Sequence, residues 1–295
     1  MPKLDQFYTM PEIAEKLFNT ALTVLGIKDE SEHTFLEPSA GTGSFSRIPT
    51  HCLAYDLEPK NDGIIRADFL QVDLTEYNHL ITIGNPPFGK RAVLAVEFFN
   101  KCAQHSDAIA MILPNQFNKY LTQKRLNPDF ALIYAEPLGD VFTTPTGKEV
   151  KGIRTTFQIW VRNGSKLGKG ENWENLRITE KPPISLPDVK IYQHNATPQS
   201  MSTVEEDWDY AVYRQGYKDY SKIFKKSDKG EIRRLMESGS DQFFFIKPLT
   251  EKACEIVLSI DYDKLALKNT TVKGFGKADF CLEYQRIERE MSKIC

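Results

Sequence analysis

The sequence contains little cysteine, and it has no cysteine pair at metal-binding spacing and no long apolar run. The five cysteines of the 295 residues are scattered, and no C-x-x-C pair occurs. This argues against a disulfide framework and a zinc site, and it suits a reducing compartment. No stretch approaches the roughly 20 apolar residues that cross a bilayer, and the first residues lack the apolar core of a signal peptide. We expect a cytoplasmic protein without a membrane segment or a bound metal.

An excess of positive charge is also missing. The chain has 38 Lys and Arg against 40 Asp and Glu, so its net charge is −2. A globally basic nucleic-acid-binding protein is therefore excluded, and any such binding must depend on a local patch. With 41% hydrophobic residues, the chain can form one large globular domain or two of ordinary size.

Short apolar runs alternate with helical segments through the first half of the chain. A helix is predicted after Thr9-Met10-Pro11-Glu12, with Thr9 as its N-cap, and a second helix over 92–105. The runs that resemble buried strands are 34–37, 52–56, 79–83, 108–113, 131–135 and 156–161. This alternation predicts an α/β fold with a Rossmann-like, doubly wound parallel sheet.

The amino-acid composition of the sequence changes near residue 164. Residues 163–170 are rich in Gly, Ser and Lys, and a proline-rich stretch follows at 182–187. Such composition is typical of a linker. We predict a nucleotide-binding domain over 1–164 and a smaller α+β domain over 165–295.

The stretch GNPPFGKR, residues 84–91, has the outline of a phosphate-binding P-loop but lacks its chemistry. Arg91 stands where a hydroxyl group is needed for magnesium. Pro86 and Pro87 have no backbone N–H to offer to a phosphate. The phosphate interpretation is therefore rejected.

The same stretch suits a planar amine. It follows a predicted strand, and a Pro-Pro turn leaves backbone carbonyls that secondary structure does not consume. The Asn85 side-chain oxygen and one such carbonyl can accept both hydrogens of an –NH2 group, while Phe88 stacks on the ring that carries it. The nitrogen lone pair can then attack a methyl sulfonium, and the proton can leave after transfer. Asn85, Pro86, Pro87 and Phe88 are the predicted catalytic residues.

Three earlier segments suit a nucleotide at the carboxyl ends of neighbouring strands. A strand leads into Glu37 and the Gly41-Thr42-Gly43 turn, where the third glycine of a dinucleotide fingerprint is replaced by Ser46. A nucleotide without a pyrophosphate, S-adenosylmethionine (SAM), fits better.

Acidic residues complete this predicted cofactor site. Asp56, with Glu58 as a neighbouring alternative, can accept the ribose hydroxyls. Asp68 can accept an adenine amine, and Phe69 can stack on the adenine ring.

These motifs and their order resemble the gamma-class DNA adenine-N6 methyltransferases of restriction–modification systems. The resemblance covers 5–9, 36–43, 56, 67–70 and 84–89, and it is only general over 165–295. It implies that the Thr9 hydroxyl reaches the methionine end of SAM. The predicted cofactor-binding residues are thus Thr9, Glu37, Ser39, Gly41, Gly43, Asp56, Asp68, Phe69 and Asn85.

The resemblance further implies a double-stranded DNA substrate, a target-recognition role for the C-terminal domain, and a cognate restriction endonuclease as a possible partner. It implies a second aromatic residue that stacks on the flipped adenine opposite Phe88. Phe142 is our choice, with Phe157 as the alternative. The polar loop that follows carries Lys148 and Lys151 as predicted DNA contacts.

Residues 210–234 contain eight Lys and Arg against three acids, with five aromatics interleaved. Phosphate neutralisation beside stacking groups suits DNA. The predicted contacts here are Arg214, Lys218, Lys222, Lys225 and Lys226. An amphipathic helix with a solvated basic face is the alternative, because 213, 217, 220 and 224 have helical spacing. Residues 268–277 are a second candidate contact loop.

Three other functions remain open at this point. The same motif serves enzymes that methylate adenine in structured RNA, such as ribosomal RNA. A protein glutamine amide presents a similar planar amine. A DNA-binding subunit without catalytic activity is the candidate from a different functional class.

Overall fold

The computed structural model describes residues 7–294, apart from 145, 169, 171–172, 217–218, 240 and 269–271. Asp5 and Gln6 of the N-terminal motif lie outside the described residues. The chain separates into two compact units, Met1–Glu180 and Lys181–Cys295, and each is considered by itself.

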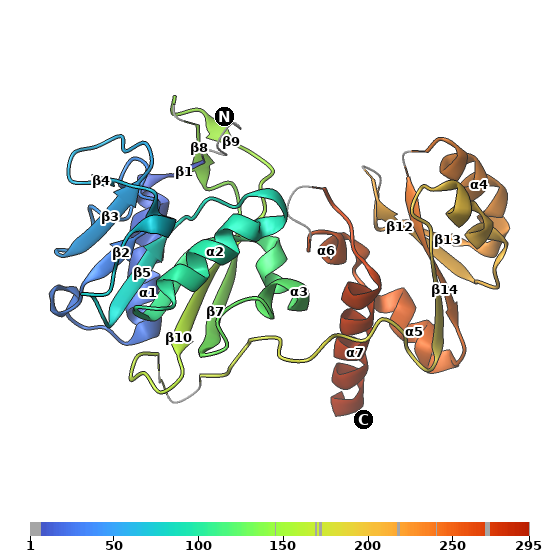
Figure 1. Cartoon of the computed structure of the whole chain (residues 1–295). Coiled ribbons are helices and arrows are strands. Elements are labelled where there is room, and N and C mark those ends of the chain that lie inside the picture. Colours follow the sequence, from blue (N-terminus) through green and yellow to red (C-terminus); the bar gives the residue numbers. More distant parts are fainter. Residues whose placement is uncertain are drawn as a thin grey trace. The chain divides into compact units, whose positions relative to one another are not determined.

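Unit 1 is built on a seven-stranded sheet (Figure 1). Its strands are β2 (Phe35–Glu37), β3 (Cys52–Asp56), β4 (Ile65–Arg66), β5 (Leu80–Gly84), β6 (Ser106–Pro114), β7 (Phe130–Leu138) and β10 (Thr155–Arg162). Their order is β4-β3-β2-β5-β6-β10-β7. Neighbours from β4 to β6 are parallel, whereas β10 runs antiparallel to β6 and β7. All six predicted strands are confirmed.

Helices cover both faces of this sheet because apolar side chains point to both. Along β6, Ala110 joins the core beneath α1 (Pro11–Leu25), and its neighbour Met111 joins the core beneath α2 (Val93–Cys102). A strand buried on both faces is typical of a doubly wound parallel sheet. The predicted fold class is confirmed, as is the helix expected over 92–105.

Short helical turns connect these elements. They are η1 (Glu30–Glu32), η2 (Phe69–Gln71), η3 (Lys90–Ala92), η4 (Asn115–Asn118) and α3 (Tyr120–Gln123).

The chain reverses its direction across the sheet at β2 and β5. From β2 it proceeds outward through β3 to β4, and it then returns to place β5 on the other side of β2. Ligands of open α/β sheets bind at the carboxyl ends of the strands at such a switch point. Residues 38–43 follow β2 and residues 85–88 follow β5, so the topology brings the two predicted motifs together.

A separate three-stranded sheet in unit 1 joins segments that are far apart in the sequence. It consists of β1 (Tyr8–Thr9), β8 (Phe142–Thr143) and β9 (Glu149–Val150). β1 and β8 are antiparallel, with Thr9 opposite Phe142. The N-terminal motif is thereby fixed beside the segment that contains the predicted second aromatic.

The prediction that Thr9 caps the first helix is wrong. Thr9 is extended and belongs to β1, while Met10 occupies the N-cap position without a side-chain hydrogen bond. The helix starts at Pro11. N–H groups in the first turn of a helix have no partner within the helix, so a proline there loses no hydrogen bond. The Thr9 hydroxyl is consequently left for another role.

The boundary between the units lies at residues 180 and 181, later than the 164 and 165 expected from composition. Backbone N–H groups of the intervening segment donate to unit 1, from Gly168 to Leu25 (3.0 Å) and from Leu176 to Leu132 (2.7 Å). The Arg177 guanidinium donates to four carbonyls, those of Gln123, Leu126, Asn127 and Phe130. Despite its linker-like composition, this segment, which we call the strap, is hydrogen-bonded to unit 1.

Unit 2 is an α+β fold with a four-stranded antiparallel sheet in the order β11-β14-β12-β13. Its strands are β11 (Val189–Gln193), β12 (Tyr210–Gln215), β13 (Ile223–Lys225) and β14 (Gln242–Pro248). Its helices are η5 (Pro198–Glu205), η6 (Lys226–Asp228), α4 (Lys229–Glu237), α5 (Glu251–Ser259), α6 (Tyr262–Ala266) and α7 (Lys277–Ile294).

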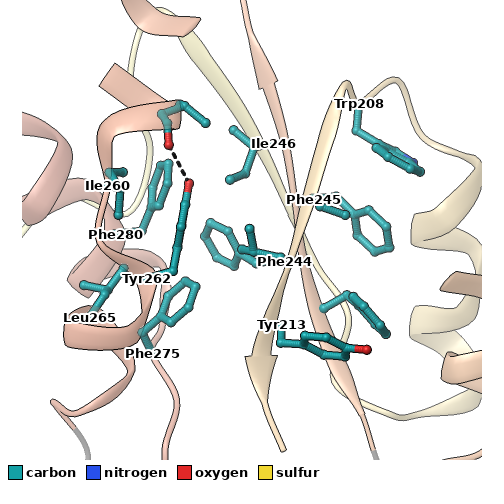
Figure 2. Packing of buried hydrophobic residues seen from close by; sticks show 14 of the residues in the cluster. Trp208, Tyr213, Phe244, Phe245, Ile246, Ile260, Tyr262, Leu265, Phe275 and Phe280 are labelled. Atoms are coloured by element: carbon teal, nitrogen blue, oxygen red, sulfur yellow. Dashed lines mark hydrogen bonds between the residues drawn. The ribbon is translucent and has the colours of Figure 1, made fainter. Parts of the chain in front are cut away.

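Aromatic side chains fill the core of unit 2 on both faces of its sheet (Figure 2). On one face, Phe244 lies 5.3 Å from Phe275 and 5.1 Å from Phe280, measured between ring centroids. On the other, Phe245 lies 5.1 Å from Trp208. Residues that alternate along β14 therefore serve opposite halves of the core.

Within the described residues, no helix is long and apolar enough to cross a membrane. The same part of the chain has no group of three or more His, Cys, Asp and Glu arranged to hold a metal ion.

Candidate active site

A cavity of about 300 Å³ lies in unit 1 at the switch point of the sheet. Its lining includes every predicted catalytic residue and every predicted cofactor-binding residue except Gly43. Those residues are Thr9, Glu37, Ser39, Gly41, Asp56, Asp68, Phe69, Asn85, Pro86, Pro87 and Phe88. Residues that were predicted from separate segments of the sequence thus line the same cavity.

The Asn85 side chain is held with its oxygen available. Its Nδ2 donates to the Phe7 carbonyl (2.9 Å), which fixes the orientation of the amide. Its Oδ1 is buried and has no hydrogen-bond partner. A buried acceptor without a partner is unfavourable by roughly 1–3 kcal/mol, so it marks a position where a donor is expected.

Backbone contacts make the turn around Asn85 rigid. The Ser39 hydroxyl donates to the Asn85 carbonyl (2.9 Å), which ties the loop after β2 to the loop after β5. The Pro86 carbonyl receives no hydrogen bond from the described residues, and Pro86 lines the cavity. The amide oxygen of Asn85 and this carbonyl are two acceptors on consecutive residues.

Phe88 lines the cavity, whereas Phe142 lies behind it. Phe142 is 0% exposed, and its ring meets Phe88 edge-on with centroids 6.3 Å apart. Its other aromatic neighbour is Phe7, at 6.1 Å. The alternative, Phe157, is also fully buried, in the core beneath α1. Neither ring lines the cavity, and Phe142 instead positions Phe88 from behind.

The Gly41 turn is shaped by its neighbours. Gly41 has φ +54°, and a Cβ there would lie 2.7 Å from Cε1 of Tyr8. Only glycine suits both the conformation and the close approach of the tyrosine ring. The Gly41 N–H donates to Asp56 Oδ2 (2.7 Å), and the Glu58 N–H donates to Asp56 Oδ1 (2.7 Å).

Asp56 therefore organises two loops at the rim of the cavity. Each of its oxygens accepts one backbone N–H and retains capacity for a second donor such as a hydroxyl. Glu58 also lines the cavity and is exposed, so both acids considered for the ribose are present. Burial raises the pKa of Tyr8, and the Asp56 and Glu58 carboxylates raise it further.

Glu37 is a buried carboxyl beneath the cavity, 2% exposed. Its Oε2 accepts a hydrogen bond from the Ser46 N–H (2.7 Å). Burial raises the pKa of Glu37 to about 8; the Ser46 hydrogen bond opposes this rise, and the Asp56 charge adds to it. The protonated form of Glu37 is therefore favoured at neutral pH.

The far end of the cavity contains Asp68 and Phe69. Asp68 accepts the Leu70 N–H at Oδ1 (3.1 Å), which starts η2. Phe69 is 2% exposed and packs on Phe98, with centroids 5.4 Å apart. The aromatic surface it presents is small, so it serves mainly as the apolar floor of this end.

Thr9 supplies a second buried polar atom without a partner. Its Oγ1 is buried and accepts or donates no hydrogen bond, while its carbonyl accepts from the Ser44 hydroxyl (2.7 Å). Thr9 lines the cavity beside Asn85. Orphaned polar atoms at Thr9 and Asn85, together with the acids at the rim, fit a ligand with amine and hydroxyl groups such as SAM.

The importance of Phe7 and Tyr8 is missed by the sequence reasoning. The first orients Asn85 through its carbonyl, and the second packs on Gly41. Their signal was present in the run Gln6-Phe7-Tyr8-Thr9, where only Thr9 was assigned a role. Phe7 and Tyr8 directly precede Thr9, just as Asp68 directly precedes the aromatic residue Phe69.

Three of the five aromatics of 210–234 are buried and are not exposed for stacking, and Tyr210 is partly buried. Tyr213, Tyr220 and Phe224 are 5%, 0% and 0% exposed and belong to the core of unit 2. The helix alternative is also wrong, because these residues lie on β12, on β13 and in the connection between them. Tyr217 lies outside the described residues.

The basic residues of the same stretch are partly engaged within unit 2. Arg214 donates to Gln242 Oε1, and Lys222 forms an ion pair with Glu231 (3.0 Å). Lys226 donates to the Glu206 carbonyl (2.8 Å). Lys225 is exposed. Lys218 lies outside the described residues.

The remaining predicted contacts lie elsewhere. In unit 1, Lys148 is exposed, and Lys151 is exposed and pairs with Glu149 (3.1 Å). In the second candidate loop, Lys277 donates to the Ile191 carbonyl (3.2 Å), and 269–271 lie outside the described residues.

No protein-family model matches the chain, and no curated protein sequence matches it. Solved structures with a similar fold include a Pyrococcus horikoshii protein proposed to be an RNA methyltransferase (18% identity, TM-score 0.44), covering 55% of this chain and 91% of that one. The methyltransferase subunit of a type I restriction-modification system from Streptococcus thermophilus has 15% identity and a TM-score of 0.40 over 88% of this chain and 59% of that one.

A third similar structure is the type IIG restriction endonuclease BpuSI, at 13% identity and a TM-score of 0.37 over 85% of this chain and 32% of that one. This chain therefore spans about three fifths and one third of the second and third proteins. Their similarity is too distant to assign an activity, which has to be argued from the cavity.

Proposed function

We propose that this chain is a SAM-dependent methyltransferase that modifies the N6 amine of an adenine flipped out of double-stranded DNA. The observation that carries the proposal is Asn85 Oδ1, a buried acceptor without a partner, fixed in orientation at a cavity that also holds the predicted cofactor residues. An enzyme acting on a base inside a duplex must extrude it into such a pocket.

One group of the residues that line the cavity is expected to bind the cofactor. Thr9, Glu37, Asp56 and Asp68 are expected to hold SAM, with Gly41 allowing close approach. SAM supplies a methyl group on a positively charged sulfur. Glu37 would lose its proton as this cationic ligand binds, so the carboxylate favours the charge beside it.

At the catalytic end, Asn85 Oδ1 and the Pro86 carbonyl accept the two hydrogens of the amine. This directs the nitrogen lone pair out of the plane of the base, where it would form the new bond to the methyl carbon while the carbon–sulfur bond breaks and its electron pair stays on the sulfur as a neutral thioether. The base stacks on Phe88, which Phe142 supports from behind. The surplus proton then leaves the nitrogen for water, so the chain needs no strong base. Proximity and orientation supply most of the acceleration.

Double-stranded DNA remains our proposed substrate, and unit 2 the proposed target-recognition element. In the described part of unit 2 the support comes from exposed cations such as Lys225 and not from Tyr213, Tyr220 and Phe224, which are buried. A cognate endonuclease stays a prediction of the sequence resemblance.

The test is modification-sensitive sequencing of plasmid DNA from a methylation-deficient host that expresses the chain. We expect N6-methyladenine within one short motif, and its loss with Asn85→Ala by at least the 10²–10³-fold typical of removing one hydrogen-bonding group from a catalytic site. Asn19→Ala, at an exposed position of α1, is the matched control and should retain the mark.

Calorimetric titration of SAM into the purified protein separates the possible failures. Failure to bind SAM would overturn the proposal altogether. Binding of SAM without a DNA mark would reject the substrate, and the same assay on ribosomal RNA would then follow.

A further inference from the structure

The turn η3, directly after the Asn85–Phe88 motif, has an unusual backbone. Arg91 has φ 55° and ψ 34°, and Ala92 has φ 58° and ψ 22°, so two consecutive residues with side chains are left-handed. This conformation is unfavourable by about 1–2 kcal/mol for each such residue, and glycine adopts it freely.

Packing explains Ala92 but not Arg91. Ala92 is 1% exposed and belongs to the core beneath α2, so its methyl group contributes apolar burial. Lys90 and Arg91 are exposed, and neither forms an ion pair or side-chain hydrogen bond with the rest of the described chain. A glycine at 91 would preserve the backbone without strain, so the fold itself gives no reason for an arginine.

The location of the two cations suggests the reason. Phe88 and Leu94 both line the cavity, and η3 is the exposed connection between them. The Ala95 N–H donates to the Phe88 carbonyl (3.3 Å), which holds both ends of this connection together. The neighbouring turn η4, Asn-Gln-Phe-Asn, contains no acid that could neutralise them.

We propose that Lys90 and Arg91 bind the phosphodiester groups that flank the flipped adenine. This inference rests on the proposed function. A base rotated out of its stack needs its backbone held on both sides, and two cations next to the ring on which the base stacks would provide this. The turn then presents two consecutive exposed cations between Phe88 and Leu94, which line the cavity.

The test uses opposite effects of one substitution on stability and on binding. Arg91→Gly relieves the backbone strain and removes one charge. We expect a melting temperature equal to or above that of the wild type and an unchanged affinity for SAM. Binding of a short fluorescein-labelled DNA duplex should weaken about tenfold, and the slope of log Kd against log salt should fall by about one.

Two matched variants isolate the charge. Ala92→Gly relieves the adjacent strained residue but keeps both cations, so its salt slope should equal that of the wild type. Lys28→Ala removes an exposed charge beyond the end of α1 and should leave both affinity and slope unchanged. Arg91→Lys should restore the slope.

Wild-type affinity and salt slope in Arg91→Gly, in a protein that methylates DNA, would overturn this inference while leaving the proposed function intact. A wild-type protein that binds SAM but no duplex at low salt would reject the DNA substrate itself, and the phosphodiester site with it.

Discussion

The two units differ in where their polar side chains lie and in what surrounds them. In unit 1, the buried oxygens of Thr9 and Asn85 lack partners and line a cavity. In unit 2, the aromatics are packed into the core, and cations such as Lys222 pair with neighbouring acids. Unit 2 also has buried polar atoms without a partner, the two ring nitrogens of His194, but these lie beside Phe243 of its core. Unsatisfied polar groups around a cavity indicate a ligand. Unit 1 therefore contains the candidate site. Unit 2 is a folded domain that carries exposed cations.

The largest effect expected from this comparison is on the stability of unit 2. Phe244→Ala should lower its free energy of unfolding by about 3–5 kcal/mol, because a fully buried ring between Phe275 and Phe280 is lost. Denaturant unfolding would show an early transition for unit 2, with SAM binding by unit 1 retained. Leu249→Ala, at a half-exposed position, is the control. Loss of SAM binding in Phe244→Ala would refute the independence of the units.

A smaller effect is expected for the shape of the cofactor end of the cavity. Gly41→Ala places a methyl group 2.7 Å from the Tyr8 ring at a positive φ, so Tyr8 must move. We expect SAM affinity to fall at least tenfold, with a loss of stability of about 1–2 kcal/mol. Gly139→Ala, where a Cβ meets nothing within 4 Å, should change neither quantity. Equal affinities in the two variants would show that the Gly41 turn does not contact the ligand.

The residues predicted for a site in unit 1 come together for a topological reason. Asp56 and Asn85 each follow a strand, and the carboxyl ends of parallel strands meet at one edge of a sheet. Their order along the chain therefore determined their meeting in space. No such rule located Phe142, whose exposure depends on how β1 pairs with β8.

Unit 2 was harder to predict because spacing and composition do not specify which face of an element is buried. Tyr213 and Phe224 fit helical spacing, yet they lie on the antiparallel strands β12 and β13, with ring centroids 5.3 Å apart. The strap before residue 181 was missed for a related reason. The contacts of Arg177 are with backbone carbonyls, which leave no pattern in a sequence.

The orphaned hydroxyl of Thr9 gives a prediction in which stability and affinity change in opposite directions. Thr9→Val keeps the shape and removes the unpartnered oxygen, so the protein should be equally stable or more stable by about 1 kcal/mol. SAM affinity should fall about five- to thirtyfold, as judged by calorimetric titration. Thr9→Ser should retain the affinity. A Thr9→Val protein that binds SAM like the wild type would remove this hydroxyl from the proposed site.

A pH dependence of the stability is also expected from Glu37. Its pKa rises from an ordinary value of 4.5 to about 8 on folding, so the folded state keeps a proton that the unfolded chain releases. The contribution of Glu37 to the free energy of unfolding of unit 1 should therefore be fully present below pH 4.5. It should be lost as the pH rises toward 8.

Glu37→Gln should flatten this slope, as measured by denaturant unfolding of unit 1 across the same pH range. Glu32→Gln, at an exposed position, should keep the wild-type slope. An unchanged slope in Glu37→Gln would mean that another group titrates.

The pairing of Thr9 with Phe142 also constrains how the protein acquires its site. All the parallel strands are encoded between these two residues, so β2 to β6 can pair before the separate sheet of β1, β8 and β9 closes. During synthesis, β1 has to wait for β8 to leave the ribosome, and a chain halted before that point would carry Asn85 without the fixed carbonyl of Phe7. The contact that orients the Asn85 amide therefore forms after the parallel strands have been synthesised, so pairing of these strands and completion of the candidate site are separate steps.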